Sequence, residues 1–365
     1  MNGFMFLFSL SFDYLSRIGF FLKSKNSITR MNLRMIIKRS SMKRWMLVLL
    51  WFSSIHINAQ NENQRERDSI VDHHVHFLSP DLISQWKALG IPFSKKDNFY
   101  SDIDSIVRLL GTRHMKLVSM AHVFTSSEFG PPASDAYEAV KKENNYLAYL
   151  KNKYPKTIRA YYGIDPLQNY TLTEIKRCQR ELGLDGIKLH FNTSQVFLTE
   201  PEHRKKVKEV FKYASIHQIP VLLHLDNSHG SFGELDVRLL ADSILSGLDY
   251  VKLHIAHFGT SGGFNARTKS VIDTFTELFS EQHPISKQHI RFDISAVGLN
   301  KDSDGIARLN EEQFKELGIY ARKLGFDKIV FGTDYPLYSA HEYLNVLKNK
   351  LNLTPDELKQ LLMEK

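Results

Sequence analysis

From residue 69 onward the chain alternates short runs of apolar and β-branched residues with longer stretches in which apolar residues recur every three or four positions. The short runs predict buried strands, and the longer stretches predict amphipathic helices. Eight strands are predicted, at residues 70–78, 115–122, 158–165, 186–191, 220–226, 250–258, 290–297 and 328–335.

Eight predicted helices alternate with these strands, at residues 102–110, 135–153, 172–182, 201–217, 234–246, 266–281, 311–324 and 341–351. Repeated right-handed βα units in this number close into a barrel of roughly 250 residues. We therefore predict an α/β fold, a single catalytic (β/α)8 TIM barrel over residues 69–351, followed by a C-terminal helix at residues 352–365. An open doubly wound sheet is the alternative, but the Gly-rich phosphate loop that usually follows its first strand is absent.

A charged start, a short apolar run and a small residue follow one another shortly before the predicted barrel. Lys43 and Arg44 precede the apolar residues 45–52, and Ala59 comes soon after them. This order is typical of a secretory signal peptide that is cleaved after the small residue. The run is shorter than the roughly 20 apolar residues that span a bilayer, which disfavours a membrane anchor.

Residues 1–41 precede this signal-peptide pattern, although signal peptides begin at or near the N-terminus. We therefore predict that translation starts at Met42, that residues 1–59 form a leader, and that residues 60–68 form a short linker. The mature protein is then exported across the inner membrane to the periplasm. A longer leader that is associated with the membrane is the alternative.

The positive charge of the chain is confined to the leader. The chain has 48 Lys and Arg and 40 Asp and Glu, but residues 1–59 hold nine of the basic residues and one acid, which leaves 39 of each elsewhere. Nucleic-acid binding requires a positive surface, so a neutral body predicts no nucleic-acid partner. The predicted partner is a small-molecule substrate. No membrane span is predicted in the mature chain, and a homo-oligomer is left open.

The cysteine content restricts the kinds of metal site that are available. Cys178 is the one cysteine, which excludes an internal disulfide and any site built from several thiolates. A metal ion in this chain needs histidine and carboxylate ligands, and 16 histidines are present.

The first predicted strand closes with Asp72-His73-His74-Val75-His76. Because successive side chains of a strand point to opposite faces, Asp72, His74 and His76 are predicted to share one face. His73 and Val75 are predicted on the other. Two imidazoles at positions i and i+2 can bind one divalent ion, with Asp72 available to hold a ligand in place. His-x-His by itself is a weak signal, because structural histidines also occur at this spacing.

Three later strands end in similar chemistry. The fifth ends at His224, the sixth runs into Ala-His-Phe-Gly at His257, and the eighth runs into Gly-Thr-Asp-Tyr-Pro at Asp334. The carboxyl ends of barrel strands meet at one mouth, so these side chains are predicted to converge. Each one alone is compatible with a structural role, but together they indicate a shared site. By strand alternation, His254 is predicted to point away from the site, toward the helical layer.

These motifs together resemble the amidohydrolase superfamily, and specifically its amidohydrolase-related branch that includes aminocarboxymuconate semialdehyde decarboxylase. The resemblance covers residues 71–338, and its motifs are specific for the superfamily but not for a substrate. It implies one divalent metal, most often zinc, with manganese or a binuclear site as alternatives. It also implies that Asp334 and His257 are catalytic, His257 lying beside the metal-bound water. The implied metal ligands are His74, His76, His224 and Asp334.

The fourth predicted strand places Lys188 and His190 on one face. In binuclear members of the superfamily a lysine at the end of this strand is carboxylated and bridges two metals. In a mononuclear member, Lys188 or His190 can bind a substrate carboxylate. The related branch is largely mononuclear, so we favour one ion and predict a substrate-binding role for both residues.

The predicted reaction is hydrolysis of an amide, lactone or ester by metal-activated water. A divalent cation lowers the pKa of bound water toward about 7, and a neighbouring carboxylate can move its proton. Decarboxylation of an unsaturated acid and non-catalytic binding of a ligand are the alternatives. TatD-type nucleases share part of the pattern but carry a Glu in a Gly-Glu-Ile-Gly-like fourth segment, where this chain reads Asp-Gly-Ile-Lys at residues 185–188.

Overall fold

The computed structural model describes residues 70–88, 103, 104, 107, 112–118, 136–280, 283–303 and 305–363. The predicted leader, signal peptide and linker over residues 1–68 lie outside the described residues. So do most of the predicted helix 102–110 and residues 119–122 of the predicted second strand. Among the helices that are described, none combines the length and the apolar character that a membrane crossing requires.

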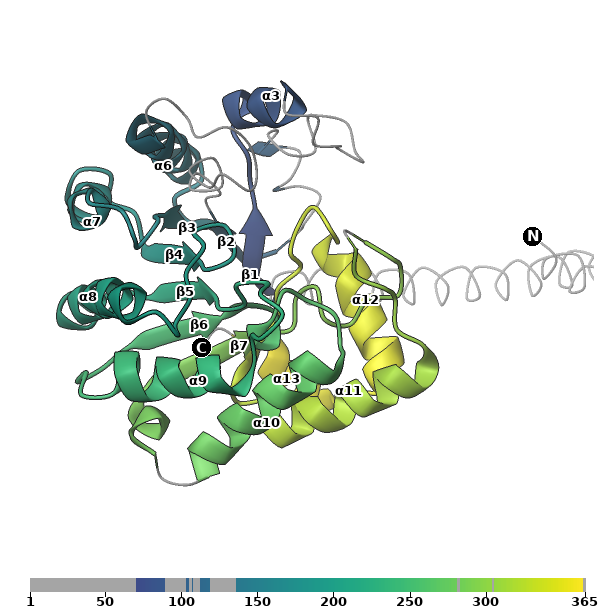
Figure 1. The fold of residues 1–365 in the computed structure, drawn as a ribbon. Helices are drawn as coiled ribbons and strands as arrows, with labels where there is room; N and C mark the ends of the chain where they lie inside the picture. The colour runs from purple at the N-terminus through teal and green to yellow at the C-terminus, as the bar shows by residue number, and fades with distance from the viewer. Residues whose placement is uncertain are drawn as a thin grey trace, which may run out of the picture. The chain divides into compact units, whose positions relative to one another are not determined.

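Eight parallel strands form one sheet in which each strand pairs with the next in sequence (Figure 1). Val75 on the first strand forms a parallel bridge with Tyr335, just after the last strand, which brings the two edges of the sheet together. The predicted (β/α)8 barrel is therefore confirmed. The strands are β1 (Val71–His76), β2 (His114–Val118), β3 (Ile158–Gly163), β4 (Gly186–His190), β5 (Val221–His224), β6 (Lys252–Ile255), β7 (His289–Asp293) and β8 (Ile329–Val330).

Helices follow the strands and pack on the outside of the sheet (Figure 1). The α-helices are α3 (Pro80–Ala88), α6 (Ala136–Lys153), α7 (Thr171–Arg180), α8 (Pro201–His217), α9 (Glu234–Leu239), α10 (Ala266–Ser280), α11 (Glu311–Leu324), α12 (Ala340–Leu351) and α13 (Pro355–Leu362). Three further helical segments are not α-helical. They are the π-helix η2 (Leu240–Leu245) and the 3-10 helices η3 (Ala256–Gly259) and η4 (Pro284–Lys287).

The local sequence explains where several of these helices begin. Asn310 caps α11, since its side chain accepts from the backbone N–H of Gln313 while the Gln313 side chain accepts from the N–H of Asn310. Thr354 caps α13 in the same way with Glu357. Such reciprocal caps satisfy backbone donors that the first helical turn leaves free. The predicted C-terminal helix is thus present as α13.

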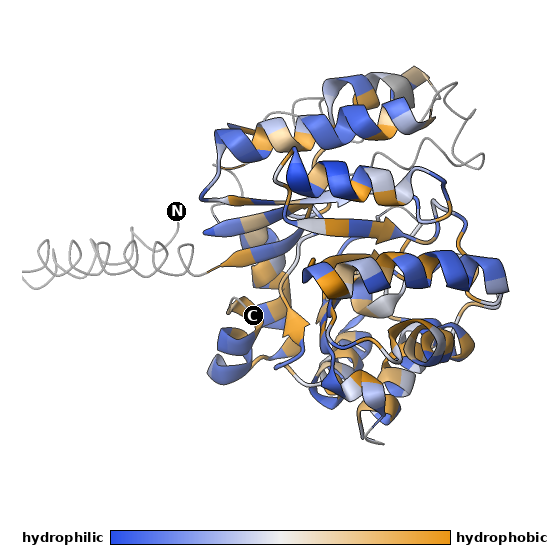
Figure 2. Ribbon diagram, turned by 90° about the vertical axis from the view of Figure 1, so that its left-hand side faces the viewer, coloured by the Kyte–Doolittle hydropathy of each residue, from blue (hydrophilic) through white to orange (hydrophobic). Residues whose placement is uncertain are grey.

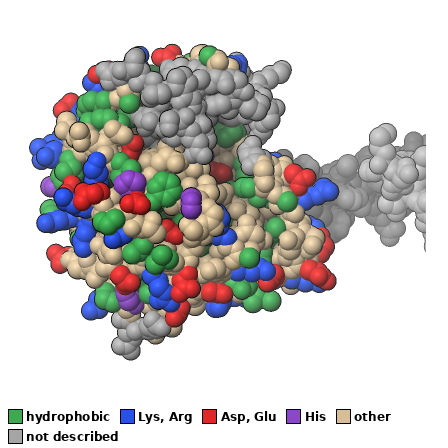
Figure 3. Space-filling view, viewed as in Figure 1, with side chains coloured by type: hydrophobic (Ala, Val, Ile, Leu, Met, Phe, Trp, Pro, Cys, Tyr) green, Lys and Arg blue, Asp and Glu red, His purple; other side chains and the backbone are tan. Residues whose placement is uncertain are grey.

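The apolar pattern accounts for the two layers of the barrel. The helices carry hydrophilic and hydrophobic residues on different sides, and the strands hold residues of both kinds (Figure 2). In β4 and β5 every residue is buried, as expected for parallel strands that are covered on both faces. Charged side chains of both signs are interspersed over the face shown in Figure 3, in agreement with a neutral body.

The strands are shorter than their predicted ranges, and the differences are large at β6 and β8. β6 ends at Ile255 because His257 and Phe258 adopt positive φ angles of 52° and 53°, which turns the chain into η3. β8 ends at Val330, and the chain beyond it bonds to neighbours outside the β7 ladder. The N–H of Phe331 donates to the carbonyl of Leu361, and the N–H of Asp334 donates to that of His74.

Candidate metal centre

The mouth of the barrel brings together two histidines of β1 and an aspartate that follows β8. Nε2 of His74 lies 3.1 Å from Nε2 of His76. Oδ1 of Asp334 lies 3.0 Å from Nε2 of His76 and 3.7 Å from Nε2 of His74. These three residues form one of two clusters of potential metal ligands among the described residues.

The first strand does not alternate as predicted, because its pairing register with β2 shifts between Asp72 and Val75. His74 and His76 face the mouth as predicted, but His73 lines a cavity inside the barrel. Asp72 also differs from the prediction. Its carboxylate accepts from the side chain and N–H of Thr333 and from the N–H of His74, so it fixes backbone rather than an imidazole. Burial raises the pKa of Asp72 to about 7.

The carboxylate that holds the His74 imidazole is Asp293, at the end of β7. Its Oδ2 lies 2.9 Å from Nδ1 of His74 and 2.8 Å from Nε2 of His254. Its Oδ1 accepts from the N–H of His257 at 2.9 Å and from the hydroxyl of Ser295 at 2.5 Å. Burial by itself would raise the pKa of Asp293, but the imidazoles of His74 and His254 outweigh this effect and hold the pKa well below its usual range. The sequence prediction missed this residue, because the seventh strand was predicted to continue to residue 297, whereas β7 ends at Asp293.

His254 does not point to the helical layer, so that prediction is wrong. Its ring lines a cavity inside the barrel, and its Nε2 contacts Asp293. The prediction counted alternate side chains from His257 back to His254 as if both lay on one strand. β6 ends at Ile255, and the positive φ angles of His257 and Phe258 change the direction of the chain between the two histidines.

The tautomer of His74 follows from these contacts. Because Asp293 is ionised, Nδ1 of His74 is the protonated nitrogen and Nε2 carries a lone pair. Burial lowers the pKa of His74 to about 3, which keeps the ring neutral. A neutral imidazole oriented by a carboxylate is the usual form of a metal-ligating histidine.

The donor atoms fit a divalent cation. Ligand atoms at about 2.0–2.2 Å from one ion lie roughly 3–3.6 Å from each other, which matches the distances among His74, His76 and Asp334. Oδ1 of Asp334 is buried and makes no well-aligned hydrogen bond. Two imidazole nitrogens and a carboxylate oxygen that converge on one point are a donor set that a divalent cation accepts. The set is suited to a metal of the zinc or manganese type.

His224 and His257 lie at the same mouth, but in different relations to these donors. His257 stacks on His74 with ring centroids 4.8 Å apart, and with His74 and Asp293 it forms the second ligand cluster. His224 belongs to neither cluster. Its ring lies 5.3 Å from that of His257, and its Nε2 lies 3.3 Å from Oγ of Ser261. Burial lowers the pKa of His224 well below its usual value, so its ring is neutral.

The two predicted substrate-binding residues of β4 also reach the mouth. His190 stacks on His224 with ring centroids 3.9 Å apart. Lys188 is fully buried, and its Nζ has no hydrogen-bond partner among the described residues. Burial lowers the pKa of Lys188 to about 8, while Asp293 and Asp334 act in the opposite direction. An unpartnered buried amine at this place leaves a cationic donor available to an anionic ligand.

The fold and this mouth define a class of protein, a (β/α)8 barrel with histidines and carboxylates arranged to hold a divalent cation. Residues 71–364 match the model of the amidohydrolase family. The chain therefore belongs to the amidohydrolase family, as the resemblance in its motifs predicted. None of the curated proteins that were compared with the chain matches it.

Solved structures with the same fold have distant sequences. 2,6-Dihydroxybenzoate decarboxylase from Rhizobium is 14% identical, with a TM-score of 0.53 over 80% of this chain and 96% of that one. A manganese-bound mutant form of 5-carboxyvanillate decarboxylase from Novosphingobium aromaticivorans is 15% identical, with a TM-score of 0.54 over 81% and 94%. A probable 2-pyrone-4,6-dicarboxylic acid hydrolase from Acinetobacter baumannii is 14% identical, with a TM-score of 0.50 over 80% of this chain and 96% of that one.

Proposed function

We propose that the protein is a metal-dependent hydrolase that cleaves an amide, lactone or ester of a small molecule. The observation that carries this proposal is the convergence of His74, His76 and Asp334 on one point, with His74 oriented by Asp293. A bound divalent cation would lower the pKa of water and polarise a carbonyl group.

In this proposal His74, His76 and Asp334 would hold the cation, and His224, which lies at the same mouth outside their cluster, is the proposed fourth ligand. Asp334 would also take a proton from the attacking water and pass it to the leaving group. His257 positions that water. Nδ1 of His257 lies 2.9 Å from the carbonyl oxygen of Ser295, and it donates to that oxygen, since the Ser295 hydroxyl donates to Asp293. Nε2 of His257 is then an acceptor that can hold a water proton.

The proposed substrate carries a carboxylate that Lys188 binds. Lys188 is the buried cation of the mouth, and His190 lies beside His224 on the same side. A carboxylate that enters the mouth would partner the Nζ of Lys188, which offsets part of the cost of burying both charges.

Decarboxylation is the second candidate reaction. Two of the structures named above are decarboxylases, of 2,6-dihydroxybenzoate and of 5-carboxyvanillate, and one is a probable 2-pyrone-4,6-dicarboxylic acid hydrolase, so the similar structures support both reactions. Incubation with a panel of aromatic acids, lactones and amides separates them. Release of carbon dioxide identifies a lyase, whereas a new acid together with an alcohol or amine identifies a hydrolase. If the protein catalyses neither reaction, the proposal that it is an enzyme is contradicted.

We propose one divalent ion per chain, with zinc as the first candidate and manganese as the second. Manganese is bound in one of the three structures named above. Elemental analysis of the purified protein by mass spectrometry gives both the identity and the number of ions. Two equivalents per chain would contradict the one-ion proposal and favour a carboxylated Lys188.

We also propose that the protein is exported to the periplasm after cleavage behind Ala59, from a precursor that starts at Met42. The proposal rests on the sequence pattern at residues 42–59. N-terminal sequencing of the native protein tests it. A mature chain that begins at residue 60 is the expected result, and a mature chain that retains Phe4 would contradict it.

A further inference from the structure

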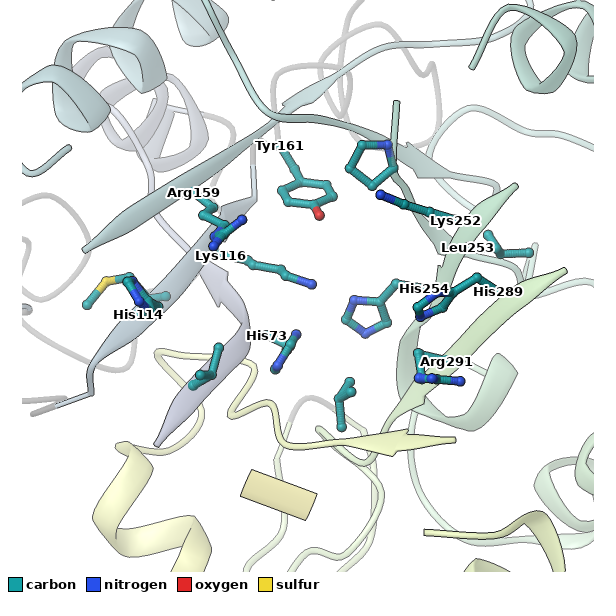
Figure 4. A pocket seen from close by; sticks show the side chains of 14 residues that line it. His73, His114, Lys116, Arg159, Tyr161, Lys252, Leu253, His254, His289 and Arg291 are labelled. Atoms are coloured by element: carbon teal, nitrogen blue, oxygen red, sulfur yellow. The ribbon is translucent and has the colours of Figure 1, made fainter. Parts of the chain in front are cut away.

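The cavity that His73 and His254 line has a volume of about 250 Å³ and lies inside the end of the barrel opposite the donor cluster (Figure 4). The residues that line it come from the amino-terminal parts of the strands, whereas the donor cluster lies at their carboxyl ends. Lys116 of β2, Arg159 of β3, Lys252 of β6 and Arg291 of β7 bring four cationic side chains to this cavity.

The charge of this cavity has one sign. Among the described residues that line it there is no carboxylate. Within the described part of the chain, Lys252 and Arg291 form no salt bridge. The pKa of His289, which also lines the cavity, is lowered first by burial and then by Arg291, Lys252 and Lys116. Cations that are crowded together in this way repel each other, and a bound anion would relieve the repulsion.

The floor of the cavity is buried and has polar atoms without partners. His254 is 6% exposed, and its ring points toward the middle of the cavity (Figure 4). Its Nε2 contacts Asp293, but its Nδ1 makes no hydrogen bond with the described residues. Nε of Arg291 is likewise buried without a partner. Nε of Arg291 is a donor, and buried donors are normally hydrogen-bonded, so it indicates a ligand that carries acceptor oxygens.

We propose that this cavity binds a small dianion, either inorganic phosphate or the phosphate group of a small metabolite. Two guanidinium and two ammonium groups supply many charge-assisted donors to the oxygens of a phosphate group. The volume of about 250 Å³ also admits a small organic group on the phosphate. The site is separate from the proposed catalytic mouth and does not depend on the proposed reaction.

Calorimetric titration of the metal-loaded protein with inorganic phosphate, at constant ionic strength, tests the proposal. Saturable binding of one equivalent is expected. In a second titration with glycerol 3-phosphate, tighter binding identifies an esterified phosphate as the natural ligand, and weaker binding identifies the free ion. No saturable binding of either probe would overturn the proposal.

Two variants locate the bound phosphate. Replacing both Lys252→Gln and Arg291→Gln is expected to weaken binding at least tenfold, because it removes two charge-assisted contacts. The single Lys252→Gln change alters an exposed residue and should weaken binding by a smaller factor. A matched control, Lys205→Gln with Lys212→Gln, removes the same charge from the exposed surface of α8 and should leave affinity unchanged. Equal loss in the double variant and the control would show a general charge effect and overturn the site.

A further variant distinguishes this cavity from the metal centre, where an anion could also bind to a cation. His76→Ala removes a proposed metal ligand at the mouth and does not touch the cavity. Phosphate binding that survives in this variant, while its metal content falls, supports the site at the amino-terminal end. Binding that disappears together with the metal would assign the phosphate to the mouth and contradict the proposal.

Discussion

The carboxylate of Asp293 lies 2.9 Å from Nδ1 of His74, although the two residues are 219 positions apart in the sequence. The same carboxylate contacts His254 on its other side, at 2.8 Å. Asp293 thus connects the donor cluster at the barrel mouth with the cationic cavity at the opposite end. Because Asp293 contacts Nδ1 of His74, the other ring nitrogen, Nε2, faces Asp334 and is available to bind a cation.

Asp293→Asn should weaken metal affinity by about 10–100-fold, the usual effect of losing a carboxylate that orients a ligating histidine. The amide would present an N–H₂ group or a weaker acceptor to Nδ1 of His74, and the ring would lose its fixed tautomer. Competition with a coloured chelator measures the affinity. Asp273→Asn on the outer helix α10 is the matched control. Equal affinities in both variants would contradict the role of Asp293.

Asp334→Asn should reduce turnover by about 100–10,000-fold, the usual contribution of a general acid–base group. An amide cannot accept the proton, and it is a weaker metal ligand. Turnover and substrate affinity are measured separately, by product assay and by calorimetry. Asp356→Asn, on the exposed first turn of α13, is the control. A variant that keeps full turnover would contradict the catalytic role, and a wild type that binds ligand without turnover would favour a binding protein.

Lys188→Met should make the folded protein more stable and weaken its binding of a carboxylate-bearing substrate. Removing a buried amine that lacks a partner is expected to raise the thermal midpoint by about 3–6 °C, equivalent to about 1–2 kcal/mol. The same change should raise KM for a carboxylate-bearing substrate at least tenfold. Calorimetry and steady-state kinetics measure the two effects, with Lys212→Met on α8 as the control. A lower midpoint with an unchanged KM would show that Lys188 has a structural role instead.

Glu143 should make the stability depend on pH. Burial raises its pKa from 4.5 to about 7, although Ser79 donates to its carboxylate. The folded protein therefore holds a proton that the unfolded chain releases at a lower pH. This contribution to stability is complete below pH 4.5 and is lost as the pH rises through 7.

Between pH 5 and pH 8 the free energy of unfolding of the wild type should fall by about 1–3 kcal/mol relative to that of Glu143→Gln, which cannot ionise. Urea unfolding at a series of pH values measures the difference. Glu138→Gln, exposed on the same helix, should follow the wild type. Parallel curves for the wild type and Glu143→Gln would contradict the raised pKa.

The barrel and most of its chemistry could be predicted because the signals are local. Apolar periodicity identifies βα units within windows of about 11–18 residues. The carboxyl ends of the strands then place His74, His76, His224 and Asp334 at one mouth without any knowledge of side-chain contacts. The family that these motifs predict is confirmed by the match over residues 71–364.

The predicted directions of His73 and His254 are wrong because their side chains do not follow the regular alternation of a β-strand. His73 faces the barrel interior because the β1–β2 register shifts next to it. His254 lines the cavity because β6 gives way to the left-handed turn at His257. Neither a register shift nor a positive φ angle has a reliable pattern in the amino-acid sequence.

The sequence by itself determined the strand and helix repeat, the barrel, and the residue types at the carboxyl end of each strand, because these follow from local periodicity and chain direction. Only the tertiary structure decided that Asp293 orients His74, that His224 stands apart from the donor cluster, and that four cations line one cavity. Those relationships depend on distances between segments that are far apart in the chain. Such distances are set by closure of the barrel and by side-chain packing, not by the order of neighbouring residues.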